Sequence, residues 1–352
     1  MSLVDEAAAP RAGEALDAAV LGEYLARQLP GLVLPLAVRQ FPSGFSNLSY
    51  LLTAGDREMV LRRPPSGTRP KSGHDMGREF RVLSALAGHF AESPRPLHFC
   101  ADESVIGAPF YVVERIRGII LRRDYPPELA PAPALVRAQQ LALVDVLAKL
   151  HGLDWRLPGL EELGRPEGYV ARQVEGWTGR YARARTDDAP DAAPVTQWLA
   201  AHQPPESSRP ALIHNDYKLD NVVFDAADPA RLIGVLDWEM ATIGDPLMDL
   251  GCSLAYWVEA ADAPALQAIR MLPTQLAGSL TRREVLDRYA SRSGRPVPDF
   301  RFYRVFGLFR LAVIVQQIYY RYFHGQTRDE RFGRLGAMAQ VLIGQAAAEI
   351  AG

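Results

Sequence analysis

The spacing of apolar residues separates a strand-rich first region of the chain from a helix-rich remainder. Up to residue 116, short apolar runs bounded by proline and glycine accompany two segments of helical period. The expected elements are an initial helix at 13–29, a strand at 40–52 interrupted at 42–44, a strand at 57–63, a helix at 74–88 and a strand at 108–116. The turn at 54–56, which contains Gly55, joins the first two strands into a hairpin.

Helical spacing dominates beyond residue 116. Strands followed by helices, rather than alternating with them, indicate an α+β fold. We therefore expect two lobes, a small β-rich lobe at 1–116 and a large, mostly helical lobe at 117–352. The elements expected in the second lobe are a long helix at 133–151, a weaker mixed segment at 161–204, short apolar runs at 211–213, 222–224 and 232–236, and helices from 250 onward, with 303–323 the most apolar.

The helix expected at 74–88 carries a carboxylate on its apolar face. Val82, Leu83 and Leu86 follow Glu79 at positions i+3, i+4 and i+7, so they share its side of the helix. A buried carboxylate without a partner bears the full cost of losing its hydration. The pattern therefore predicts a partner for Glu79 elsewhere in the fold.

Composition and charge narrow the class of protein. The 352 residues are 48% hydrophobic and 23% charged, which is ordinary for a globular chain and excludes disorder as the main state. The formal net charge of -2 gives no basic field for nucleic acid. No apolar run reaches the roughly 18 residues that a membrane helix needs. We therefore expect neither a nucleic-acid partner nor a membrane, whereas the oligomeric state stays open.

The N-terminus and the cysteines indicate a cytoplasmic protein. Residues 1–13 lack the basic start and the apolar core of a secretory signal. The two cysteines, Cys100 and Cys252, lie far apart in the sequence and have no metal-ligand spacing nearby. This usage suits a reducing compartment.

Two polar segments that follow apolar runs carry the candidate chemistry. The first reads His-Asn-Asp-Tyr-Lys-Leu-Asp-Asn over 214–221, and the second reads Val-Leu-Asp-Trp-Glu over 235–239. Asp216 can orient a hydroxyl group and accept its proton. Asn221 and Asp237 supply the oxygen ligands that Mg²⁺ prefers. Because apolar strands deliver both segments, the three side chains can converge on one point.

Lys218 adds a cation to this set. It is one of only three lysines among the 39 basic residues, so its place inside the motif stands out. Its ammonium group can reach a phosphoryl group as a point charge. A polar loop of Asx turns is the alternative interpretation of 214–221, but the second segment and the strand-rich region upstream favour phosphoryl transfer.

The motif residues resemble those of the aminoglycoside-phosphotransferase-like kinases, which share the protein-kinase fold. The resemblance spans roughly residues 41–344 and implies a bilobal fold with ATP and Mg²⁺ between the lobes. It implies that Asp216 is the catalytic base and that Asn221 and Asp237 bind Mg²⁺. It also implies that Asp249 braces the loop at 214–221. Three further motif residues receive structural roles, namely His151, Asp154 and His214.

The same resemblance assigns phosphate contacts to the first region. In the turn 43–47, backbone N–H groups and the Ser46 hydroxyl would cover the ATP phosphates. Arg62 stands where these kinases carry a lysine that pairs with phosphate and with a helix glutamate, here Glu79. Arginine keeps the charge but is bulkier. Arg63 is an alternative, although strand alternation sends the two side chains to opposite faces.

The hinge between the lobes is expected at 113–116. Here the resemblance implies that backbone groups of about Glu114 and Ile116 hold the adenine ring. ATP is therefore the expected nucleotide, with GTP left open.

Three features bear on the molecule that is phosphorylated. Asn215 replaces the arginine of the protein-kinase loop, and only twelve steps separate Asp237 from Asp249, which is too short for a segment that docks a peptide. A small-molecule alcohol is therefore favoured. The later segments are rich in arginine, with seven at 301–334 and three at 175–185. This suits an anionic or acyl-bearing substrate, with a solvated helix face as the alternative.

Three segments resemble a branch of the family that includes the kinase-like domain fused to certain acyl-CoA dehydrogenases. These segments are 60–65, 214–221 and 309–319. This branch implies an ATP-dependent phosphotransferase whose acceptor is the hydroxyl of a hydroxyacyl-CoA or another anionic or acyl alcohol. No dehydrogenase domain is expected in these 352 residues. The alternatives are an aminoglycoside or other antibiotic or amino-alcohol kinase, and a non-catalytic nucleotide-binding module, which Arg62 keeps open.

Overall fold

Tertiary packing divides the chain into two units that do not follow the sequence order strictly. The computed structural model describes residues 3–42, 47–65, 75–327 and 329–352. Besides the N-terminal part, the first unit takes in a later segment that carries Asp237. The first unit comprises Met1–Ile120, Arg156–Leu160 and Asn221–Ala241, and the second comprises Leu121–Trp155, Glu161–Asp220 and Thr242–Gly352.

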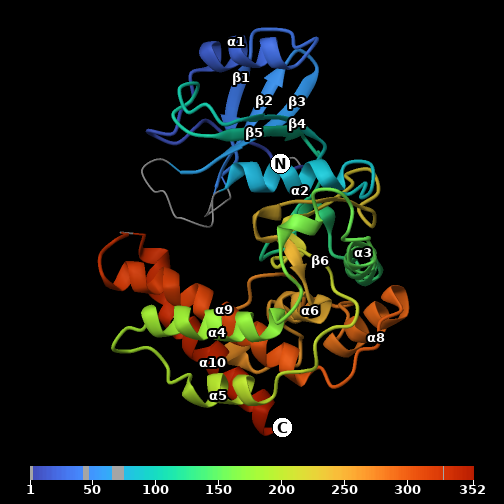
Figure 1. Cartoon of the computed structure of the whole chain (residues 1–352), viewed down its shortest axis with the longest axis vertical. Coiled ribbons are helices and arrows are strands. Elements are labelled where there is room, and N and C mark those ends of the chain that lie inside the picture. Colours follow the sequence, from blue (N-terminus) through green and yellow to red (C-terminus); the bar gives the residue numbers. More distant parts are fainter. Residues whose placement is uncertain (1–2, 43–46, 66–74, 328) are drawn as a thin grey trace. The chain divides into compact units, whose positions relative to one another are not determined.

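The first unit is built on a five-stranded antiparallel sheet with strand order β1-β2-β3-β5-β4 (Figure 1). A separate hairpin pairs β7 with β8. The elements of this unit are α1 (Ala18–Gln28), β1 (Ala37–Gln40), β2 (Leu48–Ala54), β3 (Arg57–Arg63), α2 (Met76–Leu86), β4 (Pro96–Cys100), β5 (Phe110–Glu114), β7 (Val222–Phe224), β8 (Leu232–Val235) and the 3-10 turn η4 (Trp238–Met240).

Strand alternation gives the sheet two different faces. One face packs against α1, and its core includes Leu21 and Leu25 of the helix and Tyr50 and Leu61 of the sheet, all fully buried. On the other face, Phe80 of α2 contacts the rings of Phe99 and Tyr111. Helix α2 therefore covers the face to which the even-numbered residues of β3 point.

The second unit is mostly helical, with one short antiparallel pair of strands, β6 and β9. The 3-10 turn η3 (Leu219–Asn221) lies where the two units meet in the sequence. The elements of the second unit are η1 (Pro127–Leu129), α3 (Pro133–His151), η2 (Glu161–Leu163), α4 (Tyr169–Arg183), α5 (Ala193–Ala201), β6 (Ala211–Ile213), β9 (Thr242–Gly244), α6 (Pro246–Ala255), α7 (Pro264–Ala268), α8 (Arg282–Ser293), α9 (Arg301–Phe323), η5 (Glu330–Arg334) and α10 (Leu335–Ala351).

Two glycines let α6 and α9 approach each other backbone to backbone. A Cβ atom at Gly251 of α6 would lie 2.4 Å from the Tyr303 carbonyl oxygen. A Cβ atom at Gly307 of α9 would lie 2.1 Å from the Gly251 carbonyl oxygen. Both distances are far below van der Waals contact, and the clashing atoms belong to backbone that is held in helices. This crossing therefore fixes which side chains of α9 face α6.

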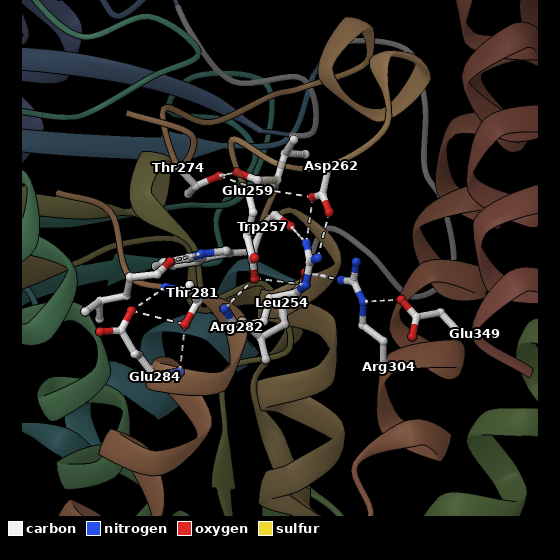
Figure 2. Close-up of polar contacts among 12 residues, drawn as sticks. Leu254, Trp257, Glu259, Asp262, Thr274, Thr281, Arg282, Glu284, Arg304 and Glu349 are labelled. Atoms are coloured by element: carbon white, nitrogen blue, oxygen red, sulfur yellow. Dashed lines mark hydrogen bonds and ion pairs between the residues drawn. The ribbon is translucent and has the colours of Figure 1, made fainter. Parts of the chain in front are cut away.

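A polar network connects the start of α8 to the segment that follows α6 (Figure 2). The guanidinium group of Arg282 donates two 2.7 Å hydrogen bonds to the Asp262 carboxylate, and its backbone N–H donates to Glu259 at 2.6 Å. Nearby, the buried Arg304 of α9 donates to the Leu254 carbonyl and to Glu349 of α10. The two arginines that Figure 2 labels thus meet carboxylates of the same unit.

Most expected elements are confirmed, and two strands were not predicted. The strand 57–63 and the helix 133–151 have the expected bounds. The strand expected at 40–52 is found as β2 at Leu48–Ala54, whereas β1 at Ala37–Gln40 precedes the expected range and shares only Gln40 with it. Strands β4 and β9 were not predicted from the sequence. Strand β4 begins with proline and is only half-buried, so it lacks a clear apolar pattern, and β9 has only three residues. Among the described residues, no helix combines the length and apolarity needed to cross a membrane.

The close crossing of α6 and α9 predicts that Gly307→Ala destabilises the protein. The added methyl group meets backbone rather than a flexible side chain, so we expect the free energy of unfolding to fall by about 1–3 kcal/mol. Gly344→Ala is the matched control, since Gly344 is an exposed glycine of α10 with nothing within 4 Å of its added Cβ. That change should stabilise the helix by about 0.5–1 kcal/mol. Urea unfolding midpoints test both, and equal midpoints for Gly307→Ala and wild type would contradict the packing argument.

Candidate active site

The loop at 214–221 begins directly after strand β6 and is held by a buried carboxylate of the second unit. Asp249 on α6 is fully buried and accepts the backbone N–H of His214 at 2.7 Å and that of Asn215 at 2.8 Å. Asn215 has φ of 64°, a left-handed conformation that asparagine tolerates better than most residues. The brace that the sequence resemblance assigned to Asp249 is therefore present as a pair of hydrogen bonds.

Asp249 also contacts His151 at the end of α3. Its Oδ2 lies 3.1 Å from Nε2 of His151, whose Nδ1 lies 2.7 Å from the Tyr289 hydroxyl. Burial by itself raises the pKa of Asp249, but the hydrogen bond from His151 and the backbone donor of His214 outweigh burial and leave that pKa below its usual value. The carboxylate is therefore ionised at neutral pH, and His151 acts as a structural partner.

Asp216 and Lys218 lie together in the second unit. Lys218 Nζ donates to Asp216 Oδ2 at 2.6 Å and lies 3.3 Å from Asp220 Oδ1. The Asp216 side chain keeps 23% of its surface exposed, whereas Lys218 keeps 11%. Burial alone would lower the pKa of Lys218, but the carboxylates of Asp216 and Asp220 raise it, so the amine stays charged. The predicted pair thus forms one accessible carboxylate beside a fixed cation.

In the first unit, Arg62 connects the carboxylates of α2 and of the segment after β8. Its Nη1 lies 3.2 Å from Glu79 Oε1, and its Nη2 donates to Asp237 Oδ1 at 2.9 Å. Glu79 is 1% exposed and also accepts the backbone N–H of Trp238 at 3.0 Å. Burial opposes the charge on Arg62, but Glu79 and Asp237 raise the pKa of Arg62 well above its usual value. The partner that Glu79 required is therefore Arg62.

Arg63 points to the opposite face of the sheet, as strand alternation predicts. Its guanidinium group donates to the backbone carbonyls of Pro64 and Ile106. Arg62, by contrast, pairs in register with Tyr111 on the face that α2 covers. Of the two arginines, Arg62 is the one that lies with Glu79 and Asp237.

Asn221 and Asp237 lie at the same end of the β7–β8 hairpin. Asn221 immediately precedes β7, and its carbonyl oxygen accepts the N–H of Leu236 at 2.8 Å. Asp237 follows Leu236, with φ of 67° and 29% of its side chain exposed. One amide oxygen and one carboxylate fit Mg²⁺, which takes few protein ligands and completes its shell with phosphates and water. These two residues therefore could hold the ion that the resemblance implies.

The segment after β8 is also fixed by Asn47, which ends the turn expected to cover the ATP phosphates, and by Arg78, which the sequence did not single out. Asn47 donates to Glu239 Oε2 at 2.6 Å. The Arg78 guanidinium group donates to the Glu239 carbonyl at 3.0 Å and to the Ala241 carbonyl at 2.6 Å. Only the tertiary contacts show that these two side chains hold the segment after β8, since no local pattern relates either residue to it.

The remaining predicted nucleotide residues divide into described and undescribed ones. Ser46 lies outside the described residues. The N–H of Glu114, at the end of β5, donates to the Arg95 carbonyl at 2.9 Å, and its side chain pairs with Arg95. For Ile116 no acceptor of its N–H occurs among the residues that the structure describes. The expected adenine contacts at this hinge therefore stay a prediction.

Sequence reasoning did not single out two side chains of the second unit that interact with Lys218 or Asp216, namely Tyr256 and Arg310. The Lys218 ammonium lies 5.6 Å from the ring centroid of Tyr256. Arg310 of α9 lies 5.0 Å from the ring centroid of Trp177. The arginine-rich composition of α9 was noted as a group, but only burial distinguishes Arg310 from the exposed arginines of the same helix.

The brace at Asp249 predicts that Asp249→Asn lowers stability. An amide nitrogen cannot accept a backbone N–H, so one buried donor loses its partner at a cost of about 1–3 kcal/mol. Because the pKa of Asp249 is lowered on folding, this contribution is complete above the ordinary aspartate pKa and is lost as pH falls through the folded value. Unfolding free energies should therefore differ most at pH 7 and converge under acid. Asp287→Asn, at an exposed position of α8, is the control, and an equal loss in both variants would refute the brace.

Comparison with known proteins places this arrangement in a family. The sequence profile described as "Phosphotransferase enzyme family" matches residues 37–283. Acyl-CoA dehydrogenase family member 10 from Mus musculus is 36% identical over 308 residues, which are 87% of this chain and 28% of that protein. Acyl-CoA dehydrogenase family member 11 from Gallus gallus is 34% identical over 335 residues, which are 93% of this chain and 42% of that protein. The chain thus spans less than half the length of either relative.

A solved structure covers nearly the whole chain. It is a Ralstonia eutropha protein described as a candidate aminoglycoside phosphotransferase, with a TM-score of 0.78 and 31% identity over 95% of this chain and 99% of that one. Both the resemblance to the kinase family and the expected α+β, protein-kinase-like fold are confirmed by these matches. The chain therefore belongs to the phosphotransferase enzyme family and has the protein-kinase-like fold of its solved relatives.

Proposed function

We propose that the chain is an ATP- and Mg²⁺-dependent phosphotransferase that acts on a hydroxyl group of a small molecule. The observation that carries this proposal is the accessible Asp216 carboxylate, held 2.6 Å from Lys218 on a loop whose backbone is braced by Asp249. Membership in the phosphotransferase enzyme family supports it. A carboxylate and a cation on a fixed loop are the groups that transfer of a phosphoryl group to an alcohol requires.

Asp216 is assigned the role of general base. It orients the acceptor hydroxyl and takes its proton as the oxygen forms a bond to the γ-phosphorus of ATP. The bond from that phosphorus to the bridging oxygen breaks, and ADP leaves. Lys218 stabilises the charge on the transferring group, because its ammonium stays protonated beside two carboxylates.

The first unit is assigned the nucleotide and the metal. Asn221 and Asp237 would hold Mg²⁺, which when bound neutralises phosphate charge. Arg62 takes the place of the usual strand lysine, with Glu79 fixing its guanidinium group. Three further contacts with ATP belong to this proposal, from backbone or hydroxyl groups of Ser46, Glu114 and Ile116.

The acceptor class rests on two supports. The arginine-rich segments at 175–185 and 301–334 favour a hydroxyacyl-CoA or another anionic or acyl alcohol as the acceptor. The solved relative described as an aminoglycoside phosphotransferase favours the second candidate, an antibiotic or amino alcohol. A non-catalytic nucleotide-binding module would require a disabled site, whereas Asp216, Asn221 and Asp237 are all present in the sequence.

The assignment of Asp216 predicts that Asp216→Asn lowers turnover by about 10²–10⁴, because an amide cannot take the acceptor proton. ADP release from Mg-ATP should be measured with hydroxyacyl-CoAs, aminoglycosides and amino alcohols. Asp287→Asn should turn over like wild type. Near wild-type turnover by Asp216→Asn would reject Asp216 as the base, and no turnover of any alcohol would count against the phosphotransferase proposal itself.

The assignment of Asp237 predicts that Asp237→Ala removes the Mg²⁺ dependence of nucleotide binding. Without the carboxylate, the ion loses one of its two protein ligands, so Mg²⁺ should no longer tighten ATP binding. Titration of a fluorescent ATP analogue with and without Mg²⁺ measures this, with Asp287→Asn as the control. A Mg²⁺ effect of wild-type size in Asp237→Ala would show that the metal is held elsewhere.

A further inference from the structure

Arg310 is a buried cation of the second unit that meets no carboxylate. Its side chain is part of α9, and the residue is 4% exposed. Among the described residues, no aspartate or glutamate oxygen lies within 4.0 Å of its guanidinium group. Arg304, two turns earlier on the same helix and also buried, instead pairs with Glu349 and the Leu254 carbonyl (Figure 2). The difference singles out Arg310, which hydrogen-bonds the Cys252 side chain but meets no carboxylate, since a buried charge without an opposite charge beside it is costly to keep.

A second arginine shares the aromatic support of Arg310. The Arg310 guanidinium lies 5.0 Å from the ring centroid of Trp177, and that of Arg180 lies 4.4 Å from the same ring. Within the described part of the chain, Arg180 has no carboxylate partner either. Burial lowers the pKa of Arg180, and repulsion from the like charge of Arg310 lowers it further. Two cations thus share one buried indole, and among the described residues neither of them forms an ion pair with a carboxylate.

The close crossing of α6 and α9 places Arg310 near the 214–221 loop. Gly307, one turn before Arg310, lies against Gly251 and Cys252 of α6. Tyr256, one turn after Cys252, lies 5.6 Å from Lys218 Nζ, which donates to Asp216.

Electrostatic coupling agrees with this placement. Burial opposes the charge on Arg310, but Cys252, Tyr256 and Asp216 together raise the pKa of Arg310. The cation is therefore permanently charged on the same side of the second unit as the proposed base.

We infer that Arg310, supported by Trp177 and Arg180, binds an anionic oxygen group of the acceptor substrate, either a carboxylate or a phosphate. That the bound anion belongs to the acceptor substrate rests on the proposed function. A planar guanidinium group offers two parallel N–H donors to such an anion, and the indole ring restricts its orientation. An anion bound here would supply the carboxylate or phosphate oxygen that Arg310 lacks and would reduce the repulsion between the two arginines.

This assignment gives the site a selectivity. An alcohol that carries an anionic group gains charge-assisted hydrogen bonds, whereas a polycationic aminoglycoside meets two like charges. The acceptor class is therefore that of anionic alcohols, such as hydroxy acids and their phosphorylated conjugates, rather than aminoglycosides.

Binding measured without turnover tests the site independently of the proposed chemistry. The full chain is titrated calorimetrically with butyrate as the carboxylate probe and inorganic phosphate as the phosphate probe, with ADP and Mg²⁺ present to occupy nucleotide phosphate contacts. Wild type should bind at least one probe, and the probe that binds identifies the source of the anion. Arg310→Gln should weaken binding about ten- to a hundredfold, and Arg310→Lys less, since lysine keeps the charge but not the paired donors.

Two surface variants on α4 keep the test valid if Arg310→Gln fails to fold. Arg180→Gln removes an exposed arginine at Trp177 and should weaken anion binding several-fold. Arg183→Gln, at an exposed position of the same helix, is the matched control and should leave binding unchanged. Binding of neither probe to wild type, or equal affinity of wild type, Arg310→Gln and Arg180→Gln, would overturn the inference.

Kinetics separate this inference from the proposed function. With 4-hydroxybutyrate and 1,4-butanediol as a matched anionic and neutral pair, Arg310→Gln should raise KM for the acid about ten- to a hundredfold and leave its kcat nearly unchanged. The diol should show no difference between wild type and variant. Anion binding that depends on Arg310 without any turnover would contradict the phosphotransferase proposal alone, whereas turnover with no preference for the acid would contradict the anion site alone.

Discussion

The 214–221 loop depends on the buried carboxylate of Asp249. Its two oxygens accept successive backbone N–H groups at 2.7 and 2.8 Å, and His151 offsets the cost of burying its charge. These contacts stabilise the left-handed backbone conformation of Asn215, which is otherwise unfavourable for a residue other than glycine. Helices α6 and α3 thus determine the position of Asp216, because they supply the groups that fix the backbone of its loop.

A similar solution holds the first unit. Glu79 is buried on α2 and could not stay ionised without a donor, so Arg62 and the N–H of Trp238 approach it together. Arg62 then has a second N–H group for Asp237. The arginine in place of a lysine explains why one side chain serves two carboxylates, since a guanidinium group presents several donors in one plane. Arg310 departs from this rule, and its missing carboxylate is what makes it a candidate for binding substrate.

Local patterns predicted those parts of the fold and site that depend on near neighbours. The bounds of 57–63 and 133–151 followed from apolar spacing, and the need of Glu79 for a partner followed from its place on an apolar helix face. Strand β9 was not predicted because its three residues become a strand only by pairing with β6. Arg310 was likewise hidden among ten arginines of similar sequence context, which differ only in burial and in partners.

The sequence by itself determined the change from a strand-rich to a helix-rich region, the family and the motif that carries Asp216, Asn221 and Asp237, because each of these depends on residues close along the chain. Tertiary structure decided which charges meet. It assigned residues 221–241 to the first unit, chose Arg62 over Arg63 as the partner of Glu79, and left Arg310 without a carboxylate. The physical reason is that pairing of charges depends on distance and burial in space, and residues far apart in sequence set both.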